Sequence, residues 1–241
     1  ASTGINQVML QYTTNNGANW VNITSTPLSA FTGNYTWVTP NLSSPSVKVR
    51  IYDYTMPSVA DTSEQFLIYK PQITLTAPNG GESWKVGSNQ TITWNYAYVT
   101  RLKIEYSTDG GNTYNLIDDN VNPASGSYNW TIPNTSTKKA IVKLTDYNNS
   151  TVKDTSDNTF RIKNIILLSP NGSENFQVLR TYPIKWNSGG IDNIKIDYST
   201  NNGTNWFNIG TISADSNKFN WNITLSYPTS NNYTIRVSDV D

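Results

Sequence analysis

Apolar and polar residues alternate with a period of two along most of the chain. The middle third shows this most clearly, in short runs such as residues 73–77, 102–106 and 128–132. Such alternation places one set of side chains on a buried face and the other in water, as in a half-buried β-strand. Gly, Asn, Asp and Pro separate the runs, and no window has the period of an amphipathic helix. The pattern predicts an all-β protein.

Aromatic and acidic residues recur along the chain with a period of about 93 residues. A repeat at a fixed spacing indicates a tandem array of similar modules. The anchors that recur in all three copies are Tyr12, Tyr106 and Tyr198; Trp20, Tyr114 and Trp206; Trp37, Trp130 and Trp221; and Asp53, Asp146 and Asp239. Trp94 and Trp186 also match, as do residues 78–80 and 170–172.

The repeat divides the chain into three modules, of which only the middle one is complete. We predict a partial module at residues 1–70 that lacks its first strands, and a complete module at 71–163. A second partial module at 164–241 lacks its last strand. The junctions are only a few residues long, so we expect a semi-rigid array.

Each complete repeat holds about seven short strands, which is typical of an antiparallel β-sandwich of immunoglobulin or fibronectin type III character. Because the chain has no Cys, the Trp and Tyr anchors must fill the space between the sheets. The fold prediction is therefore an all-β tandem array of antiparallel Ig-like or FN3-like sandwiches with a period of about 93 residues.

Composition removes most kinds of chemistry. The chain has no Cys and no His, which excludes thiol nucleophiles, zinc–thiolate sites and imidazole bases. Lys and Arg total 17, equal to Asp and Glu, and no basic run marks a nucleic-acid surface. No apolar stretch is long enough to span a bilayer. We therefore predict a protein that is not an enzyme, has no cofactor, binds no nucleic acid and has no direct membrane span.

Residues 107–114 resemble the Asp-box of sialidases. Looser copies lie at residues 13–20 and 199–206, with Asn15 and Asn201 in place of Asp109. In sialidases the box is a structural hairpin, and that is the role we expect here. Gly110 and Gly111 would supply the positive φ values of a type I′ turn, with the aromatic residue beneath it.

Carboxylates occur in several short clusters, but none has the dense spacing of a calcium loop. Asp61 and Asp154 instead recur one repeat apart, before the last strand, where we expect them to shape a turn. Glu82 and Glu174 occupy the same repeat position, which favours a structural role over a glycosidase pair. We predict no catalytic residues, cofactor-binding residues or metal ligands.

Two surface features remain as candidates for binding or modification. Twelve N-x-S/T sequons are candidate glycosylation sites: Asn22, Asn34, Asn41, Asn89, Asn129, Asn134, Asn148, Asn149, Asn171, Asn202, Asn222 and Asn232. Some aromatic residues fall outside the matched anchors and are candidates for a sugar-stacking platform: Tyr54, Tyr96, Tyr98 and Tyr147.

The order of motifs in the middle repeat, PNGGESW at 78–84, YSTDGGNTY at 106–114 and YNWTIP at 128–133, resembles a known family. The family consists of Ig-like sandwich repeats in large secreted or surface proteins of bacteria and archaea. A related module occurs in a yeast Ser/Thr-rich cell-wall family. The third repeat departs from the motif within residues 171–176, and Leu179 replaces Gly87. The resemblance implies stalks, spacers and accessory domains.

Our leading interpretation is a non-enzymatic extracellular or cell-surface structural protein: a rod, fibre or surface-layer component. The alternative is an accessory spacer or carbohydrate-binding region of a larger secreted enzyme or adhesin. Expected partners are other copies of the chain or further repeats, with cell-surface glycans as a further candidate. The partial end modules are completed either by neighbouring subunits or by a longer chain, and the first should not fold alone.

Overall fold

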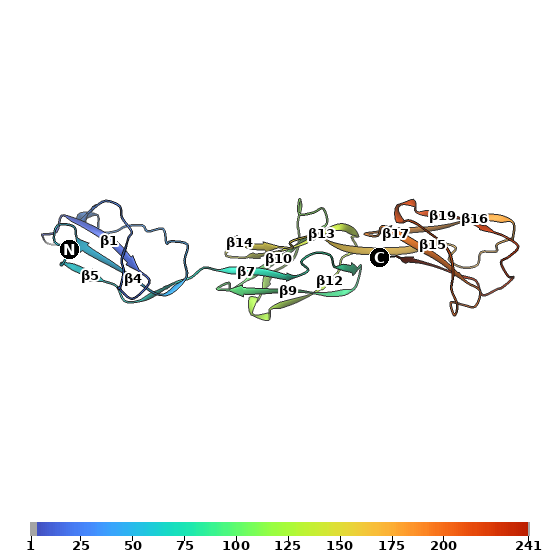
Figure 1. The fold of residues 1–241 in the computed structure, drawn as a ribbon, viewed down its shortest axis with the longest axis horizontal. Helices are drawn as coiled ribbons and strands as arrows, with labels where there is room; N and C mark the ends of the chain where they lie inside the picture. Colours follow the sequence, from blue (N-terminus) through green and yellow to red (C-terminus); the bar gives the residue numbers. More distant parts are fainter. Residues whose placement is uncertain (1–3, 241) are drawn as a thin grey trace. The chain divides into compact units, whose positions relative to one another are not determined.

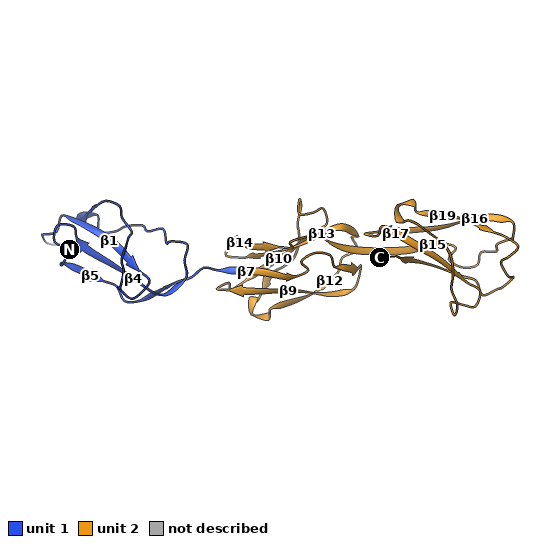
Figure 2. Cartoon of the chain, in the orientation of Figure 1, with its two compact units in different colours: residues 1–72 blue, residues 73–241 orange. Residues whose placement is uncertain are grey.

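The computed structural model describes residues 4–240 and divides the chain into two compact units. The first is Ala1–Gln72 and the second is Ile73–Asp241 (Figure 2). The described residues form β-sheets whose strand pairs are antiparallel except for the parallel pair β8–β15, and they contain no α-helix, only three single-turn 3₁₀ helices. The predicted all-β class is therefore confirmed. No described helix is long and apolar enough to cross a bilayer.

The first unit is built on one sheet rather than two. Its strands pair in the order β2-β1-β4-β5, and β3 and β6 pair with β1 and β4. The elements are β1 (Gln7–Thr13), β2 (Val21–Asn22), β3 (Leu28–Ser29), η1 (Ala30–Thr32), β4 (Ser44–Asp53), β5 (Ala60–Thr62) and β6 (Phe66–Ile68). No second sheet occurs among the described residues of this unit. One face of its central strands therefore lacks the opposing layer of a sandwich.

The middle module of the second unit has both layers (Figure 1). Its three-stranded sheet has the order β12-β9-β7, and the opposing sheet contains β11-β10-β13-β15, with β14 paired to β13 and β8 paired to β15. The elements are β7 (Gln72–Ala77), β8 (Ser83–Lys85), β9 (Asn89–Ala97), β10 (Leu102–Ser107), β11 (Asn115–Val121), η2 (Pro123–Ser125), β12 (Ser127–Thr131), β13 (Thr137–Asp146), β14 (Asn149–Thr155) and β15 (Phe160–Ser169). Two facing antiparallel sheets of this kind make an Ig-like sandwich.

The third module repeats the arrangement, but its described residues contain no counterpart of β8, of β14 or of a closing strand like the first half of β15. Its layers are β15-β16-β19 and β18-β17-β20. The elements are β16 (Arg180–Gly189), β17 (Asn193–Ser199), β18 (Phe207–Ser213), η3 (Ala214–Ser216), β19 (Lys218–Ile223) and β20 (Thr234–Asp239). Strand β20 pairs only with β17 among the described strands, so its other edge has no ladder partner there.

Each sandwich core is centred on a tryptophan. In the middle module it comes from β9, which lies beside β7, and in the third module from β16, which lies beside β15. Trp94 on β9 and Trp186 on β16 are buried, and their indole nitrogens donate to the backbone carbonyls of Pro123 and Ala214 at 2.9 and 3.0 Å. The predicted anchor tyrosines and tryptophans also meet. For example, the ring centroids of Tyr106 and Trp130 lie 5.1 Å apart. Burying these rings provides the area that the small aliphatic content does not.

Strand β15 belongs to both modules of the second unit. Residues 160–163 pair with β13 and β8 of the middle module, whereas residues 164–169 pair with β16 of the third. The boundary predicted between residues 163 and 164 therefore falls inside a continuous strand. A strand that is hydrogen-bonded on both sides of a junction removes the backbone freedom that a linker would have.

Gly190 lets the two modules of the second unit approach closely. A Cβ at this buried position would collide with the Ile162 carbonyl oxygen on β15, and the residue has φ +72°. Both the space and the backbone conformation therefore require glycine.

Replacing Gly190 with Ala should destabilise the second unit by more than about 3 kcal/mol, because strain from positive φ adds to a collision with backbone. Gly126→Ala is the matched control: its φ is +65° and nothing lies within 4 Å of the position that a Cβ would take, so only about 1–2 kcal/mol is expected. Urea unfolding, monitored by hydrogen exchange, measures the change in unfolding free energy for both variants. Equal costs would show that the junction is not closely packed at Gly190.

Candidate functional site

The two matched glutamates hold loops. Glu82 accepts hydrogen bonds from the backbone N–H groups of Asn79 and Gly80 at 2.8 and 2.9 Å. Glu174 makes the same pair of bonds in the third module, at 2.8 and 2.7 Å. Backbone donation from Asn171 lowers the pKa of the Glu174 carboxyl. Both carboxylates are thus engaged in the turn that enters each module.

The buried carboxylates on the central strands are neutralised by neighbouring cations. Glu105 lies 2.7 Å from Lys103 and 2.9 Å from Lys143, measured from nitrogen to oxygen. Burial acts to raise the pKa of Glu105, but the hydrogen bonds from the two lysines hold it below its ordinary value. Asp197 is the counterpart in the third module, where its side chain is 1% exposed and Arg236 approaches to 2.7 Å.

One cation in each module stacks on the aromatic residue of the hairpin, and in the second and third modules it is a cation that also pairs with the buried carboxylate. Arg50, Lys143 and Arg236 lie 4.4, 3.6 and 4.2 Å from the ring centroids of Trp20, Tyr114 and Trp206. The cation on β4, β13 or β20 therefore links the hairpin to the sheet by a cation–π contact. Sequence analysis missed this arrangement, although the three cations are spaced by 93 residues and the repeat comparison could have revealed them.

The Asp-box forms a closed set of local hydrogen bonds. The Ser107 hydroxyl donates to Asp109 at 2.6 Å and accepts from the Gly111 N–H at 2.8 Å. Asp109 also accepts from Thr113, and these bonds lower the pKa of its carboxyl. Gly110 and Gly111 have the expected positive φ values, and Tyr114 lies beneath the turn, against Gly111. The expected structural role is confirmed by these bonds.

The residues around Asp154 bind distant segments rather than their own turn. The Asp154 carboxylate accepts from the Leu75 N–H on β7 at 2.8 Å. Ser156 donates to the Pro78 carbonyl at 2.8 Å. The expectation that this motif shapes a local turn is therefore wrong for Asp154, because the residue lies within β14 and its Oδ2 accepts from a strand 79 residues away in the sequence. Among the described residues, no group of three or more acidic side chains is positioned to hold a metal ion.

The twelve sequon asparagines are all exposed in the described structure. Exposure is the physical requirement for attaching a glycan, and glycosylation of these residues stays a prediction. The platform tyrosines Tyr54, Tyr96, Tyr98 and Tyr147 are also exposed. However, the Arg101 guanidinium lies 3.5 Å from the centroid of the Tyr147 ring and covers one of its faces.

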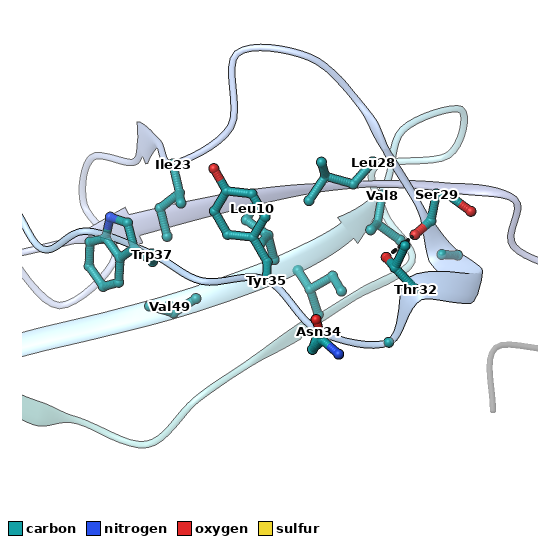
Figure 3. Close-up of a pocket in the computed structure, with 13 residues that line it drawn as sticks. Val8, Leu10, Ile23, Leu28, Ser29, Thr32, Asn34, Tyr35, Trp37 and Val49 are labelled. Atoms are coloured by element: carbon teal, nitrogen blue, oxygen red, sulfur yellow. Dashed lines mark hydrogen bonds between the residues drawn. The ribbon is translucent and has the colours of Figure 1, made fainter.

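The first unit contains an apolar groove of about 370 Å³ on the uncovered face of its sheet (Figure 3). Leu10 on β1 and Val49 on β4 form its floor, while Tyr35 and Trp37 lie over them from the segment that follows η1. Sequence analysis did not predict this groove, although the missing first strands imply an uncovered face. The complete lining is Val8, Leu10, Ile23, Leu28, Ser29, Ala30, Thr32, Gly33, Asn34, Tyr35, Trp37, Val49 and Ile51.

Several ion pairs lie at the junction between the middle and third modules of the second unit. Asp192 accepts from Lys138 at 2.7 Å and from Arg161 at 2.6 Å, and both cations belong to the middle module. These bonds hold the pKa of the Asp192 carboxyl at about 2. Nearby, Lys163 on the shared strand lies 2.6 Å from Asp239 of β20. Asp192 has no counterpart in the repeat comparison, so sequence analysis did not identify it.

No family model matches the chain, and no curated protein sequence matches it. Among solved structures, the chicken CNTN1 FN1–FN3 domains have a TM-score of 0.34 and 13% identity, covering 98% of this chain and 85% of theirs. The fibronectin(III)-like modules of Clostridium thermocellum CbhA have a TM-score of 0.26 and 16% identity, covering 70% and 87%. The structure of Dpr11 IG1 bound to DIP-gamma IG+IG2 has a TM-score of 0.30 and 6% identity, covering 69% of this chain and 96% of that one. Scores this low carry no conclusion about function.

Asp192→Asn should lower the melting temperature of the second unit at neutral pH, because it removes the charged acceptor shared by the two cations. The folded-state pKa lies below the ordinary value of 3.8, so this stabilisation is complete above about pH 5 and is lost as the pH falls through 2. Calorimetry of both proteins from pH 2 to 7 measures it. A melting difference that stays constant down to pH 2 would contradict the charge-based explanation.

Proposed function

We propose that the chain is a non-enzymatic structural array, a rod, fibre or surface-layer component in which sandwich modules are joined in fixed succession. The observation that carries this proposal is the continuous strand β15, whose two halves belong to two different sandwiches. A module boundary inside a hydrogen-bonded strand transmits force and orientation along the chain. A flexible linker between two functional domains would not do so.

The side chains at the same junction support a mechanical role. Asp192 binds two cations of the middle module, and Lys163 binds Asp239 of the third. Gly190 brings the backbones together where any side chain would collide. Three different contacts thus fix one module against the next, in addition to the shared strand.

The glutamates of the two sandwich modules also fit this role. Glu82 and Glu174 each bind the backbone of their own loop, and Glu105 pairs with Lys103. In the contacts described, no two of these glutamates share a partner, as the two acids of a glycosidase would across a cleft. Their positions are explained by turns and ion pairs that every module needs. We therefore retain the proposal that the chain is not an enzyme.

We also place the array outside the cell, at or beyond the cell surface. All twelve sequons are exposed, and the surface owes its polarity to Asn, Ser and Thr more than to charge, since charged residues make up 14% of the chain. Intact mass of the natively produced protein, before and after deglycosylation, tests this placement. A mass that shows no glycan on any sequon would remove this support.

Distance measurements between spin labels test the joint directly. The chain has no Cys, so Thr91→Cys on β9 and Asn222→Cys on β19 introduce two unique, exposed labelling sites in the two modules. We expect one narrow distance distribution, because the shared strand fixes the modules. The control inserts Gly-Gly-Ser between Lys163 and Asn164, which should broaden the distribution roughly twofold or more. Equal widths in the two proteins would reject a rigid joint.

A further inference from the structure

We propose that the groove of the first unit is a docking site for an extended peptide strand with the side-chain pattern of β7–β9. The occupant we infer is the β7–β9 segment of a further sandwich repeat, with an Ile-x-Trp sequence on its last strand. This interaction goes beyond the structural role proposed above and does not depend on the joint in the second unit. Three separate features of the first unit match such a strand.

The first feature is the apolar face itself. Val8, Leu10, Val49 and Ile51 line the groove, and Ile51 is 41% exposed. The repeat comparison gives their counterparts in the middle module as Leu102, Ile104, Val142 and Leu144, all fully buried. In that module, Ile92 and Trp94 of β9 belong to the same buried cluster as these counterparts. The groove thus lies where β9 would place its apolar side chains.

The second feature is a strand-like segment without a ladder. Residues 34–38 match β12 in sequence, with Tyr35 and Trp37 at the positions of Tyr128 and Trp130, but they are not in a strand. Strand β12 pairs with β9 alone, placing Tyr128 opposite Ile92. Strand β19 pairs in the same register with β16. The first unit has no described strand beside residues 34–38, so an incoming strand of the β9 type would complete this ladder.

The third feature is a set of hydrogen-bonding groups in matching positions. The carbonyls that accept the buried indoles of the other two modules, those of Pro123 and Ala214, correspond to that of Ala30, which lines the groove. An incoming tryptophan that enters the groove therefore has a backbone acceptor at the equivalent place.

The acceptors for the preceding strand are also present. Asp154 and Ser156, which bind β7 and the Pro78 loop, correspond to Asp61 and Ser63. Without those partners, the Ser63 hydroxyl donates to the carbonyl of the next residue, Glu64, at 2.8 Å. Exposed Asp61 accepts from the adjacent Thr62 N–H. The first unit thus carries counterparts of the side chains that hold β7 in the middle module.

The test uses the full chain and a synthetic peptide of residues 71–98, which includes β7, β8 and β9. Calorimetric titration should show one peptide per chain with a roughly micromolar dissociation constant. Hydrogen exchange should show new protection at residues 34–38 and at the centres of β1 and β4. Residues 73–240 should not change. Absence of binding, or protection confined to residues 73–240, would overturn the proposal.

Two substitutions locate the interaction. A peptide with Trp94→Ala should bind at least tenfold more weakly, because it loses the side chain that fills the groove. Ile51→Asp in the full chain should have a similar effect, whereas Leu116→Asp, at an exposed position on β11, should have none. Because the peptide variant leaves the protein unaltered, the result does not depend on whether Ile51→Asp folds. Equal affinity for the two peptides would reject the tryptophan site.

Two other occupants are distinguished in the same experiments. If a second copy covers the groove, light scattering will show a dimer that Ile51→Asp converts to a monomer, and the peptide will not bind. If the groove is a general apolar site, a hydrophobic dye will compete with both peptides equally and residues 34–38 will gain no protection. Either result would overturn the proposal.

Discussion

The structure depends on covering the apolar face of each sheet with a second sheet that carries a tryptophan. In the two modules of the second unit, Trp94 and Trp186 fill this role and find a backbone acceptor for their indole nitrogen. Burial of a large aromatic contributes more area than any aliphatic side chain, and its N–H must be satisfied when water is excluded. With few aliphatic residues in the chain, the rest of each sandwich is arranged around this one side chain.

The first unit shows what happens to a sheet when that layer is absent. The same β12-like sequence is present at residues 34–38, but it forms no strand because its ladder partner is missing. Ile51 is partly exposed although its counterpart, Leu144, is fully buried. Local alternation therefore supplies the potential for a strand, while pairing and burial decide whether the strand forms.

The alternation of apolar and polar residues predicted some strands and not others. Strands with clean alternation, such as β7, β9 and β12, were predictable because each has one buried face. Strands β11 and β14 were not individually predicted: their sequences are largely polar, and their extended state comes from pairing with β10 and β13. The hairpin turns were predictable from local glycine and asparagine. Asp192 and the groove were not, because each depends on parts of the fold that the repeat pattern does not place together.

The shared strand β15 and the open groove of the first unit have a common physical origin. Strand β15 is shared because a strand has two edges and two halves, so one half can finish one sandwich while the other begins the next. The groove of the first unit is open for the complementary reason: the apolar face of its sheet has no second layer among the described residues, and residues 34–38 have no described strand beside them with which to form a ladder. A β-sandwich can gain or share a single strand. For this reason one strand can join two modules at β15, and a module that lacks strands, such as the first unit, can be completed by strands from elsewhere.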